Sequence, residues 1–398
     1  MADTELQQSE QQERMTISVG PHHPSTHGVL RVVLEIEGER VVKATPEHGF
    51  LHTGIEKNAE NLTWQQANTV IDRMDYLSPL SNNLGFCLAA EKLLGLEVPE
   101  RVKYVRVLLT ELQRIASHLV WLGTQGLDLG AATTFWWTFD LREGILDILE
   151  ETTGARMNPS YFRVGGMARD IPANFHQMVD KWLKKFHERF PDLRDLLERN
   201  PIFLKRTKGI GKITAEQCLQ LSIPGPVMRA SGIPYDVRKA FPYSGYEKFD
   251  FNIPTRTEGD VYARYLVRMA EMEESARIVR QALDGLPEGL WHVDDRKIWP
   301  PPKAEVKQSM EALIHHFKLV SQGFDVPAGE VYQALEGPRG EIGFYVVSDG
   351  RNKPMRVRVR PPSFYLVHSL PAMIEGGLLA DMVAVIGAAD PVFGEVDR

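Results

Sequence analysis

The sequence predicts an α+β protein with a mainly helical core, a small N-terminal antiparallel β region and a β-hairpin in the C-terminal half. Apolar and polar residues alternate between turn residues over 16–52, which is the pattern of antiparallel strands. Apolar residues then recur at helical spacing in several segments between 100 and 285. A second alternating stretch lies at about 340–362. We therefore expect three regions: a disordered tail at 1–15, the β region at 16–52, and a mainly helical domain at 53–398.

Composition narrows the class of protein. The chain has 398 residues, 43% of them hydrophobic and 25% charged, as in ordinary globular proteins. Its formal charge, 46 − 53 = −7, gives no support for a nucleic-acid partner. The only two cysteines, Cys87 and Cys218, are too few for a four-thiolate iron–sulfur or zinc site, and they favour a reduced, cytoplasmic setting. The sequence shows neither a signal peptide nor an apolar run of about 18 residues that could span a membrane.

The stretch GPHHPSTHGVLR at 20–31 joins the first two expected strands and holds three histidines. Its two prolines each fix a φ angle, so the loop is stiff for its length. Three interpretations stay open: histidines that bond nearby backbone, a metal site, or a loop that delivers a proton or contacts a ligand. Metal binding is the weakest, because the spacing of His23 and His27 needs a helix, which Pro24 and Gly28 oppose.

The helical region has recognisable starts and ends. We expect a helix at 100–123, opened by Pro99 and closed by Gly123, and another at 138–153 that ends at Gly154. Glycines, prolines and turn residues at 200–258 predict a long irregular segment. The remaining predicted helices are 175–199 around Pro191, 259–285 and 303–321.

Long motifs along the chain resemble a known family. GPHHPSTHGVLR, GFLHTGIEK, DRMDYLSPLSNN and the closing DPVFGEVDR occur in this order. Together they resemble the D subunit of respiratory complex I, NADH:quinone oxidoreductase, from about residue 16 to residue 398. That family is related to the large subunit of nickel–iron hydrogenases, and the resemblance implies a hydrogenase-large-subunit-like fold.

The hydrogenase relationship predicts that this chain binds no metal. Hydrogenase large subunits hold their metals with two Cys-x-x-Cys pairs. In this alignment the four cysteine positions are occupied by Asp75, Ser78, Val392 and Glu395. Soft metals of this kind need thiolate ligands, and none of the four thiols is present. The resemblance implies that the cavity keeps its shape without the metal and binds quinone instead.

The resemblance also implies the residues of a quinone-reduction site. It places the two proton donors on His27 and Tyr76, and makes Asp128, in GLDLGA, the carboxylate partner of His27. The chemistry is suitable, because an imidazolium titrates near about 6.5, a phenol near about 10, and either can hydrogen-bond a carbonyl oxygen. A carboxylate would orient the histidine ring and raise its proton affinity.

Three further positions concern a partner subunit. Arg73 resembles an arginine near the terminal 4Fe-4S cluster of the neighbouring B subunit, where a cation favours the reduced cluster. Thr53 stands where some family members have arginine. Asn158 stands where many have a histidine close to the cluster, and asparagine cannot titrate.

The implied function is that of one subunit in a larger enzyme. Electrons pass from NADH through FMN and iron–sulfur clusters of other subunits to quinone, coupled to proton translocation. The expected partners are the B, C, H and I subunits, with peripheral attachment to the cytoplasmic side of the cell membrane. We expect no cofactor on this chain alone and no activity in isolation. The alternatives are a scaffold subunit of a related membrane-bound hydrogenase-like complex, or a hydrogenase-like catalytic subunit, which the missing thiols oppose.

Overall fold

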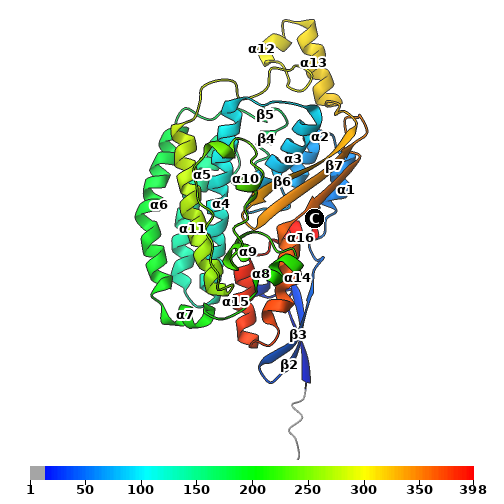
Figure 1. Cartoon of the computed structure of the whole chain (residues 1–398). Helices are drawn as coiled ribbons and strands as arrows, with labels where there is room; N and C mark the ends of the chain where they lie inside the picture. The colour runs from blue at the N-terminus through cyan, green and yellow to red at the C-terminus, as the bar shows by residue number, and fades with distance from the viewer. Residues whose placement is uncertain (1–13) are drawn as a thin grey trace, which may run out of the picture.

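Long helices packed side by side form the helical part of the molecule in the computed structural model, which describes residues 14–398 (Figure 1). The central helix α4 packs against α5 and α11, and α6 lies outside α5 and α11. The bounds of these four helices are α4 Glu100–Asp128, α5 Ala132–Thr153, α6 Phe175–Glu198 and α11 Val261–Asp284. Among residues 14–398, no helix combines the length and apolar content needed to cross a membrane.

Two glycines let α4 and α5 approach closely. A Cβ atom at Gly123 would lie 2.5 Å from the Thr138 hydroxyl oxygen, and one at Gly126 would lie 2.9 Å from the Thr134 Cβ. The prediction that Gly123 ends the helix is therefore wrong, because α4 continues to Asp128. These glycines are packing positions rather than helix caps, and they carry α4 far enough to place Asp128 at its C-terminal end.

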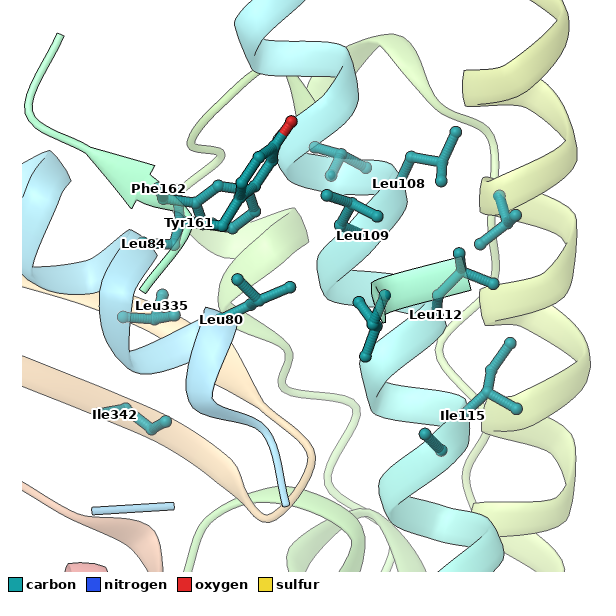
Figure 2. Packing of buried hydrophobic residues seen from close by; sticks show 14 of the residues in the cluster. Leu80, Leu84, Leu108, Leu109, Leu112, Ile115, Tyr161, Phe162, Leu335 and Ile342 are labelled. Atoms are coloured by element: carbon teal, nitrogen blue, oxygen red, sulfur yellow. The ribbon is translucent and has the colours of Figure 1, made fainter. Parts of the chain in front are cut away.

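A three-stranded antiparallel sheet covers the other side of the core. It consists of β6 (Gly329–Gly337), β7 (Gly340–Ser348) and β8 (Arg356–Arg360), in that order. Helix α3 (Pro79–Leu94) packs on β6 and β7. Figure 2 shows Leu80 and Leu84 of α3 and Leu335 of β6 on one side of α4, whereas Leu112 and Ile115 of α4 point to its other side. All five residues belong to one hydrophobic cluster.

A second core joins the N-terminal sheet to the C-terminal helices. The strands β1 (Arg14–Val19), β2 (Arg31–Glu37) and β3 (Arg40–Glu47) pair antiparallel in chain order. The β2 residues Val32, Leu34 and Ile36 are at most 4% exposed, which is the alternation that the sequence predicts. They share this core with the last three helices, α14 Pro362–Ile374, α15 Leu379–Ala389 and α16 Phe393–Asp397.

Short elements complete the fold. Figure 1 shows α12 and α13 at one end of the molecule and the N-terminal sheet at the other. The remaining elements are η1 Pro24–Thr26, α1 Ile55–Asn61, α2 Trp64–Ile71, β4 Phe162–Arg163, β5 Gly166–Met167, α7 Pro201–Thr207, α8 Ala215–Gln220, α9 Gly225–Ala230, α10 Val237–Ala240, η2 Tyr246–Lys248, α12 Lys303–Val306 and α13 Met310–Ser321.

The α+β class is confirmed, with several corrections to its parts. The hairpin at 340–362 is present as β7 and β8, but the sequence did not indicate its third strand, β6. The segment 200–258 contains short helices and is not wholly irregular. The helix expected at 303–321 is split into α12 and α13. The tail expected at 1–15 lies mostly outside the described residues, and β1 already begins at Arg14. The division into domains stays a prediction.

Buried ion pairs connect the helices to the large sheet. Arg238 donates to Glu111 at 3.0 Å and to Asp236 at 2.6 Å, and Arg229 donates to both Glu271 and Glu336 at 2.8 Å. We call the whole set the bundle cluster: Glu111, Arg114, His118, Arg229, Asp236, Arg238, Glu271 and Glu336. Every member is at most 3% exposed. Buried charges of this kind hold only while their partners are present.

Candidate functional site

The histidine loop contains the short helix η1, and its three histidines take different positions. Pro24 occupies the first helical position, and the Nδ1 of His23 accepts a hydrogen bond from the Ser25 backbone N–H at 3.2 Å. This is a helix cap, so His23 matches the interpretation in which a histidine of the loop bonds nearby backbone. His22 is exposed. His27 ends η1 in the left-handed conformation, with φ 55°, and its ring lies 5.9 Å from the ring of Phe393 on α16.

Tyr76 lies in the turn between α2 and α3. The Asp75 carboxylate fixes this turn by accepting hydrogen bonds from the backbone N–H groups of Leu77 (3.1 Å) and Ser78 (3.2 Å). Tyr76 itself is half-buried, and within residues 14–398 its hydroxyl makes no hydrogen bond. Burial, the largest effect, raises the pKa of Tyr76 above its usual value, and the nearby carboxylates of Asp75, Asp390 and Glu395 add to the rise. The phenol is therefore protonated at neutral pH and free to donate to a ligand.

Helix α16 brings His27 and Tyr76 into one neighbourhood. Phe393 contacts the His27 ring, and the next residue, Gly394, lies against Tyr76. A Cβ atom at Gly394 would lie 3.2 Å from the Tyr76 ring and 2.4 Å from the carbonyl oxygen of Met74, so only glycine fits there. The two predicted proton donors come from separate segments of the sequence, and both lie against this one helix.

A group of four buried charged residues lies beside His27 and Tyr76, and we call it the site cluster: Asp75, Arg339, Asp390 and Glu395. Arg339, in the turn between β6 and β7, contacts the Asp75 and Asp390 carboxylates, each at 3.1 Å. It also donates to the Ser117 hydroxyl at 2.6 Å. Asp390 ends α15 with φ 54°, a left-handed turn that leads the chain into α16. All four residues are at most 4% exposed.

The site cluster holds three carboxyl groups but a single arginine, and its acids bind protons tightly. Burial raises the pKa of Asp75 above its usual value, although Arg339 opposes the change. Burial and the neighbouring Asp75 raise the pKa of Glu395 to about 8. His27 shows the reverse shift: loss of solvation around its ring lowers its pKa, Asp390 opposes this, and Arg339 reinforces it. Close to neutral pH the site thus offers a neutral imidazole, a phenol and a protonated carboxyl group.

Asp128 lies beside the histidine loop, but not in the way the resemblance implied. The carboxylate of Asp128, at the end of α4, is 3.5 Å from the Ser25 hydroxyl and close enough to His23 to interact electrostatically. Within the described part of the chain it makes no hydrogen bond with His27. In this structure the Asp128 carboxyl group thus contacts Ser25 of η1, and its role as the carboxylate partner of His27 stays a prediction. Burial raises the pKa of Asp128, against the opposing effects of Ser25 and His23.

Arg73, which is expected to face a partner subunit, lies on the turn that carries Tyr76. Arg73 is exposed, and its guanidinium donates to the carbonyl of Thr69 on α2. Thr53 is also exposed, in the loop before α1. Asn158 has φ 50° and a buried side-chain oxygen that has no partner within residues 14–398. Arg73 thus presents a cation at the surface, and its place near a partner's cluster stays a prediction.

The positions that align with hydrogenase cysteines are buried but differ in their contacts. Asp75 and Glu395 belong to the site cluster, whereas the hydroxyl of Ser78 bonds that of Ser81 at 2.7 Å. The backbone N–H of Val392 donates to the Ser363 hydroxyl at 3.0 Å. Within residues 14–398, no group of three or more His, Cys, Asp or Glu side chains is arranged to hold a metal ion.

Sequence reasoning missed two residues of the site cluster. Arg339 sits in Gly337-Pro-Arg-Gly340, a turn whose composition is typical of an exposed loop. Asp390 stood out only as part of a motif, without a role. The single signal available was the closing DPVFGEVDR, which brings three acidic residues close together in an otherwise apolar stretch. Only the folded chain shows that Arg339 reaches the acids from a different part of the sequence.

Comparison with known proteins identifies relatives over the whole chain. Residues 128–398 match the family described as "Respiratory-chain NADH dehydrogenase, 49 Kd subunit". The chain is 61% identical over 402 residues to the D 1 subunit of NADH-quinone oxidoreductase from Symbiobacterium thermophilum, covering 100% of both chains. It is 56% identical to the D 2 subunit from Roseiflexus sp., covering 98% of this chain and 94% of the relative. It is 50% identical to the D subunit from Geotalea uraniireducens, covering 100% of both.

Proposed function

Because this chain belongs to the family of the 49 kDa subunit of respiratory-chain NADH dehydrogenase, the D subunit of NADH-quinone oxidoreductase, we propose that it supplies the protein side of the quinone-reduction site. Membership in this family makes the chain a subunit of an oxidoreductase. The observation that supports the location of the site is that His27 and Tyr76 lie against the same helix, α16, beside the site cluster.

In this proposal His27 and Tyr76 bind the quinone head group and supply its protons. Reduction of a quinone to a quinol needs two electrons and two protons, one proton for each carbonyl oxygen. The Tyr76 hydroxyl has no competing hydrogen bond within residues 14–398, so it can donate to one carbonyl oxygen. The neutral His27 imidazole can donate a hydrogen bond to the other carbonyl oxygen, and it supplies a proton there once its second ring nitrogen has taken one up. A positioned acid of this kind typically contributes about 10²–10⁴-fold to a rate.

Asp128 acts on the loop and not on the quinone. Its carboxylate contacts Ser25 within η1, two residues before His27. Holding Ser25 fixes the short helix and so orients the His27 ring at its end. The electrostatic attraction to His23, which caps the same helix, works in the same direction. We therefore assign Asp128 as a positioning residue.

Arg73 and its surroundings face the partner subunit that holds the terminal 4Fe-4S cluster. An exposed guanidinium on the turn that also carries Tyr76 would place a cation between the cluster and the quinone. The cation favours the more negative, reduced cluster. Asn158 cannot take up a proton, so we expect no coupling of cluster potential to pH through that position.

The remaining parts of the reaction belong to other subunits. We propose that NADH, FMN and the iron–sulfur clusters are held by partners, that the B, C, H and I subunits contact this chain, and that the assembly sits on the cytoplasmic face of the cell membrane. Proton translocation is then a property of the whole complex. On its own, this chain would bind no cofactor and would not turn over.

Three substitutions test the site. Tyr76→Phe removes one hydroxyl and keeps the ring, so assembly should survive while quinone reduction falls by about 10²–10⁴-fold. His27→Ala should behave similarly, and Asp128→Asn should be milder because it acts through the loop. The measurement is NADH:quinone turnover beside NADH oxidation by an artificial acceptor that takes electrons upstream. Retained upstream activity with lost quinone activity supports the site.

The same measurements separate the proposal from the scaffold alternative. If all three variants keep full quinone turnover, the chain is a scaffold and the assigned site is wrong. If both activities fall together, the residues serve assembly. Nickel analysis of the purified complex addresses the hydrogenase-like alternative, for which stoichiometric nickel bound to this chain is required.

A further inference from the structure

Glu395 is a buried acid that the proposed reaction does not use, and one of its oxygens is fixed as an acceptor. Its Oε1 accepts hydrogen bonds from the backbone N–H of Ser363, at 3.1 Å, and from the Ser363 hydroxyl. That hydroxyl in turn accepts from the Val392 N–H at 3.0 Å, so its own proton points to Glu395. Two donors converge on Oε1, and any proton on the carboxyl group is therefore carried by Oε2.

The other oxygen is in a place where negative charge is costly. Oε2 of Glu395 is buried and has no hydrogen-bond partner within residues 14–398. An ionised carboxylate would leave charge on this oxygen without any donor, whereas a neutral acid puts an O–H group there. The hydrogen-bond pattern thus fits the protonated form of Glu395.

The charge balance of the site cluster gives the same result. Asp75 and Asp390 each contact Arg339 at 3.1 Å, but Glu395 makes no hydrogen bond with an arginine within residues 14–398. The buried Arg268 of α11 also interacts electrostatically with Asp390, so the nearby cations serve Asp75 and Asp390, and each buried charge needs a partner. Glu395 is the acid left without one. Its raised pKa, about 8, agrees with this geometry.

We propose that Glu395 stores a proton and returns it to Tyr76 after that residue has protonated the quinone, an inference that rests on the proposed function. The O–H bond of the Glu395 carboxyl breaks and a new O–H bond forms on the Tyr76 phenolate oxygen. Glu395 is left as a carboxylate and takes up a proton from solvent before the next turnover. No electron passes through Glu395, because the partner's cluster reduces the quinone. Glu395 does not touch the quinone in this proposal. It acts on the reaction only through Tyr76.

Glu395 follows the residue that lies against the Tyr76 ring, and no hydrogen bond joins its Oε2 to the Tyr76 hydroxyl within residues 14–398, so the proposed transfer runs through an intervening water molecule. Gly394, the preceding residue, lies against the Tyr76 ring, and the negative charge of Glu395 is among the causes that raise the pKa of Tyr76. The titratable and charged groups around Glu395 and its neighbours are Asp75 of the Tyr76 turn, Arg339 of the β6–β7 turn, Asp390 before α16, His27 of the loop and Arg268 of α11. Helix α14, which packs on α16, carries Tyr365 and His368. After Glu395, Asp397 contacts His48 and Arg398 contacts Glu56 of α1.

The test is the pH profile of quinone turnover in the assembled complex, divided by the upstream activity. In the wild-type complex turnover should fall as pH rises through about 8, where Glu395 loses its proton. Glu395→Gln keeps the size and the acceptor oxygen but cannot store a proton. We expect the quinone turnover rate at low pH to be about tenfold lower than in the wild type. This loss is smaller than the loss of about 10²-fold or more expected for a group that itself protonates the substrate. We also expect no further fall near pH 8.

A second variant covers the case in which Glu395→Gln does not assemble. Ser363→Ala removes a donor that favours the ionised carboxylate, so the fall in turnover should move to higher pH. Infrared difference spectra of the two complexes at pH 7 supply a readout independent of activity. The carbonyl band of a protonated carboxylic acid should be present in the wild type and weaker in Glu395→Gln.

The outcomes separate this inference from the proposed function. If Tyr76→Phe impairs quinone turnover but Glu395→Gln leaves the rate, the pH profile and the infrared band unchanged, Glu395 stores no proton and the site still stands. An unshifted profile in Ser363→Ala also overturns the inference. If Tyr76→Phe itself has no effect, the proposed function fails.

Discussion

Two clusters of buried arginines and carboxylates lie in the same chain, and they differ in how their charges are balanced. In the bundle cluster, Glu111 is held by Arg114 and Arg238, and these cations lower its pKa to about 2 despite burial. Glu271 is held by Arg229 and His118, with the same result. In the site cluster three carboxyl groups share Arg339, and burial raises the pKa values of Asp75 and Glu395. Burial is similar in both, and the difference is whether each acid is paired with a cation: Glu111 and Glu271 both are, whereas Glu395 makes no ion pair within residues 14–398.

One residue of the bundle cluster supports this reasoning. Glu336 is bonded to Arg229, but Arg229 also serves Glu271, and Asp236 lies nearby. Burial and the charge of Asp236 raise the pKa of Glu336 to about 7. The bundle cluster has four acids and three arginines, and its one excess acid shows the behaviour of the site cluster on a smaller scale. A balanced cluster stabilises the fold, and an unbalanced one can hold a proton.

The largest expected effect comes from removing a cation of the bundle cluster. Arg238→Met leaves Glu111 and Asp236 buried without that partner, which should cost about 3–5 kcal/mol of the free energy of unfolding. We expect little assembled complex and a much lower melting temperature for what assembles. Arg358→Met is the matched control, because that arginine pairs with Glu56 at the surface, where a pair contributes about 0–1 kcal/mol. Equal losses for both variants would contradict the difference in burial.

Removing the arginine of the site cluster should cost less at low pH. Arg339→Met leaves acids that can become neutral by binding protons, so at pH 6 we expect a loss of about 1–3 kcal/mol, as for unsatisfied polar groups. The loss should grow as pH rises, because the acids must then ionise without a cation. The measurement is the melting temperature of the complex at pH 6 and pH 8.5. A loss that does not depend on pH would mean that the acids of the site cluster are ionised at both values.

The third prediction concerns the pH dependence of stability. The pKa of Glu395 is raised in the folded chain to about 8 from an ordinary value of 4.5. The folded state therefore holds a proton that the unfolded state releases, and this contribution is full below pH 4.5 and is lost as pH rises through 8. Stability should fall with pH across that window, by at most about 1.4 kcal/mol per unit from this group. In Glu395→Gln the fall should be shallower, as measured by thermal unfolding at several pH values.

The smallest expected effect is on a partner. Arg73→Met removes an exposed cation that we place near the partner's cluster, so the reduction potential of that cluster should fall. We expect a shift below about 59 mV, the change that corresponds to a tenfold effect for a one-electron centre. Redox titration of the assembled complex measures it. A potential that stays the same in a fully assembled complex would show that Arg73 is structural.

How far the sequence predicted this molecule depends on the range of the interactions concerned. The β2 alternation and the Gly154 cap follow from neighbouring residues, and both were predictable. Gly123 has the same local signature as a cap, but its role is decided by Thr138 on another helix. The strand β6 was missed because its residues do not alternate cleanly, although it forms a local hairpin with β7 across residues 338–339.

The candidate site shows the same limit. The family motifs singled out His27, Tyr76 and Asp128, but the contact of Asp128 with Ser25 was not predictable, because the relative position of α4 and η1 cannot be read from spacing. Arg339 lies in a Gly-Pro-Arg-Gly turn whose composition indicates an exposed loop. The charge balance of the site cluster depends on this arginine. This charge balance arises only in the folded chain, where the Tyr76 turn, the β6–β7 turn and the C-terminal segment come together.

The most direct test of the site is a structure of the whole complex with quinone bound. The proposal predicts one quinone carbonyl oxygen at hydrogen-bond distance, about 2.6–3.2 Å, from the Tyr76 hydroxyl, and the other facing His27. The head group should lie over α16, next to Phe393 and Gly394, with the site cluster behind it. A quinone head group bound elsewhere, with the Tyr76 hydroxyl out of reach in the reduced and the oxidised complex, would contradict the assignment of this site.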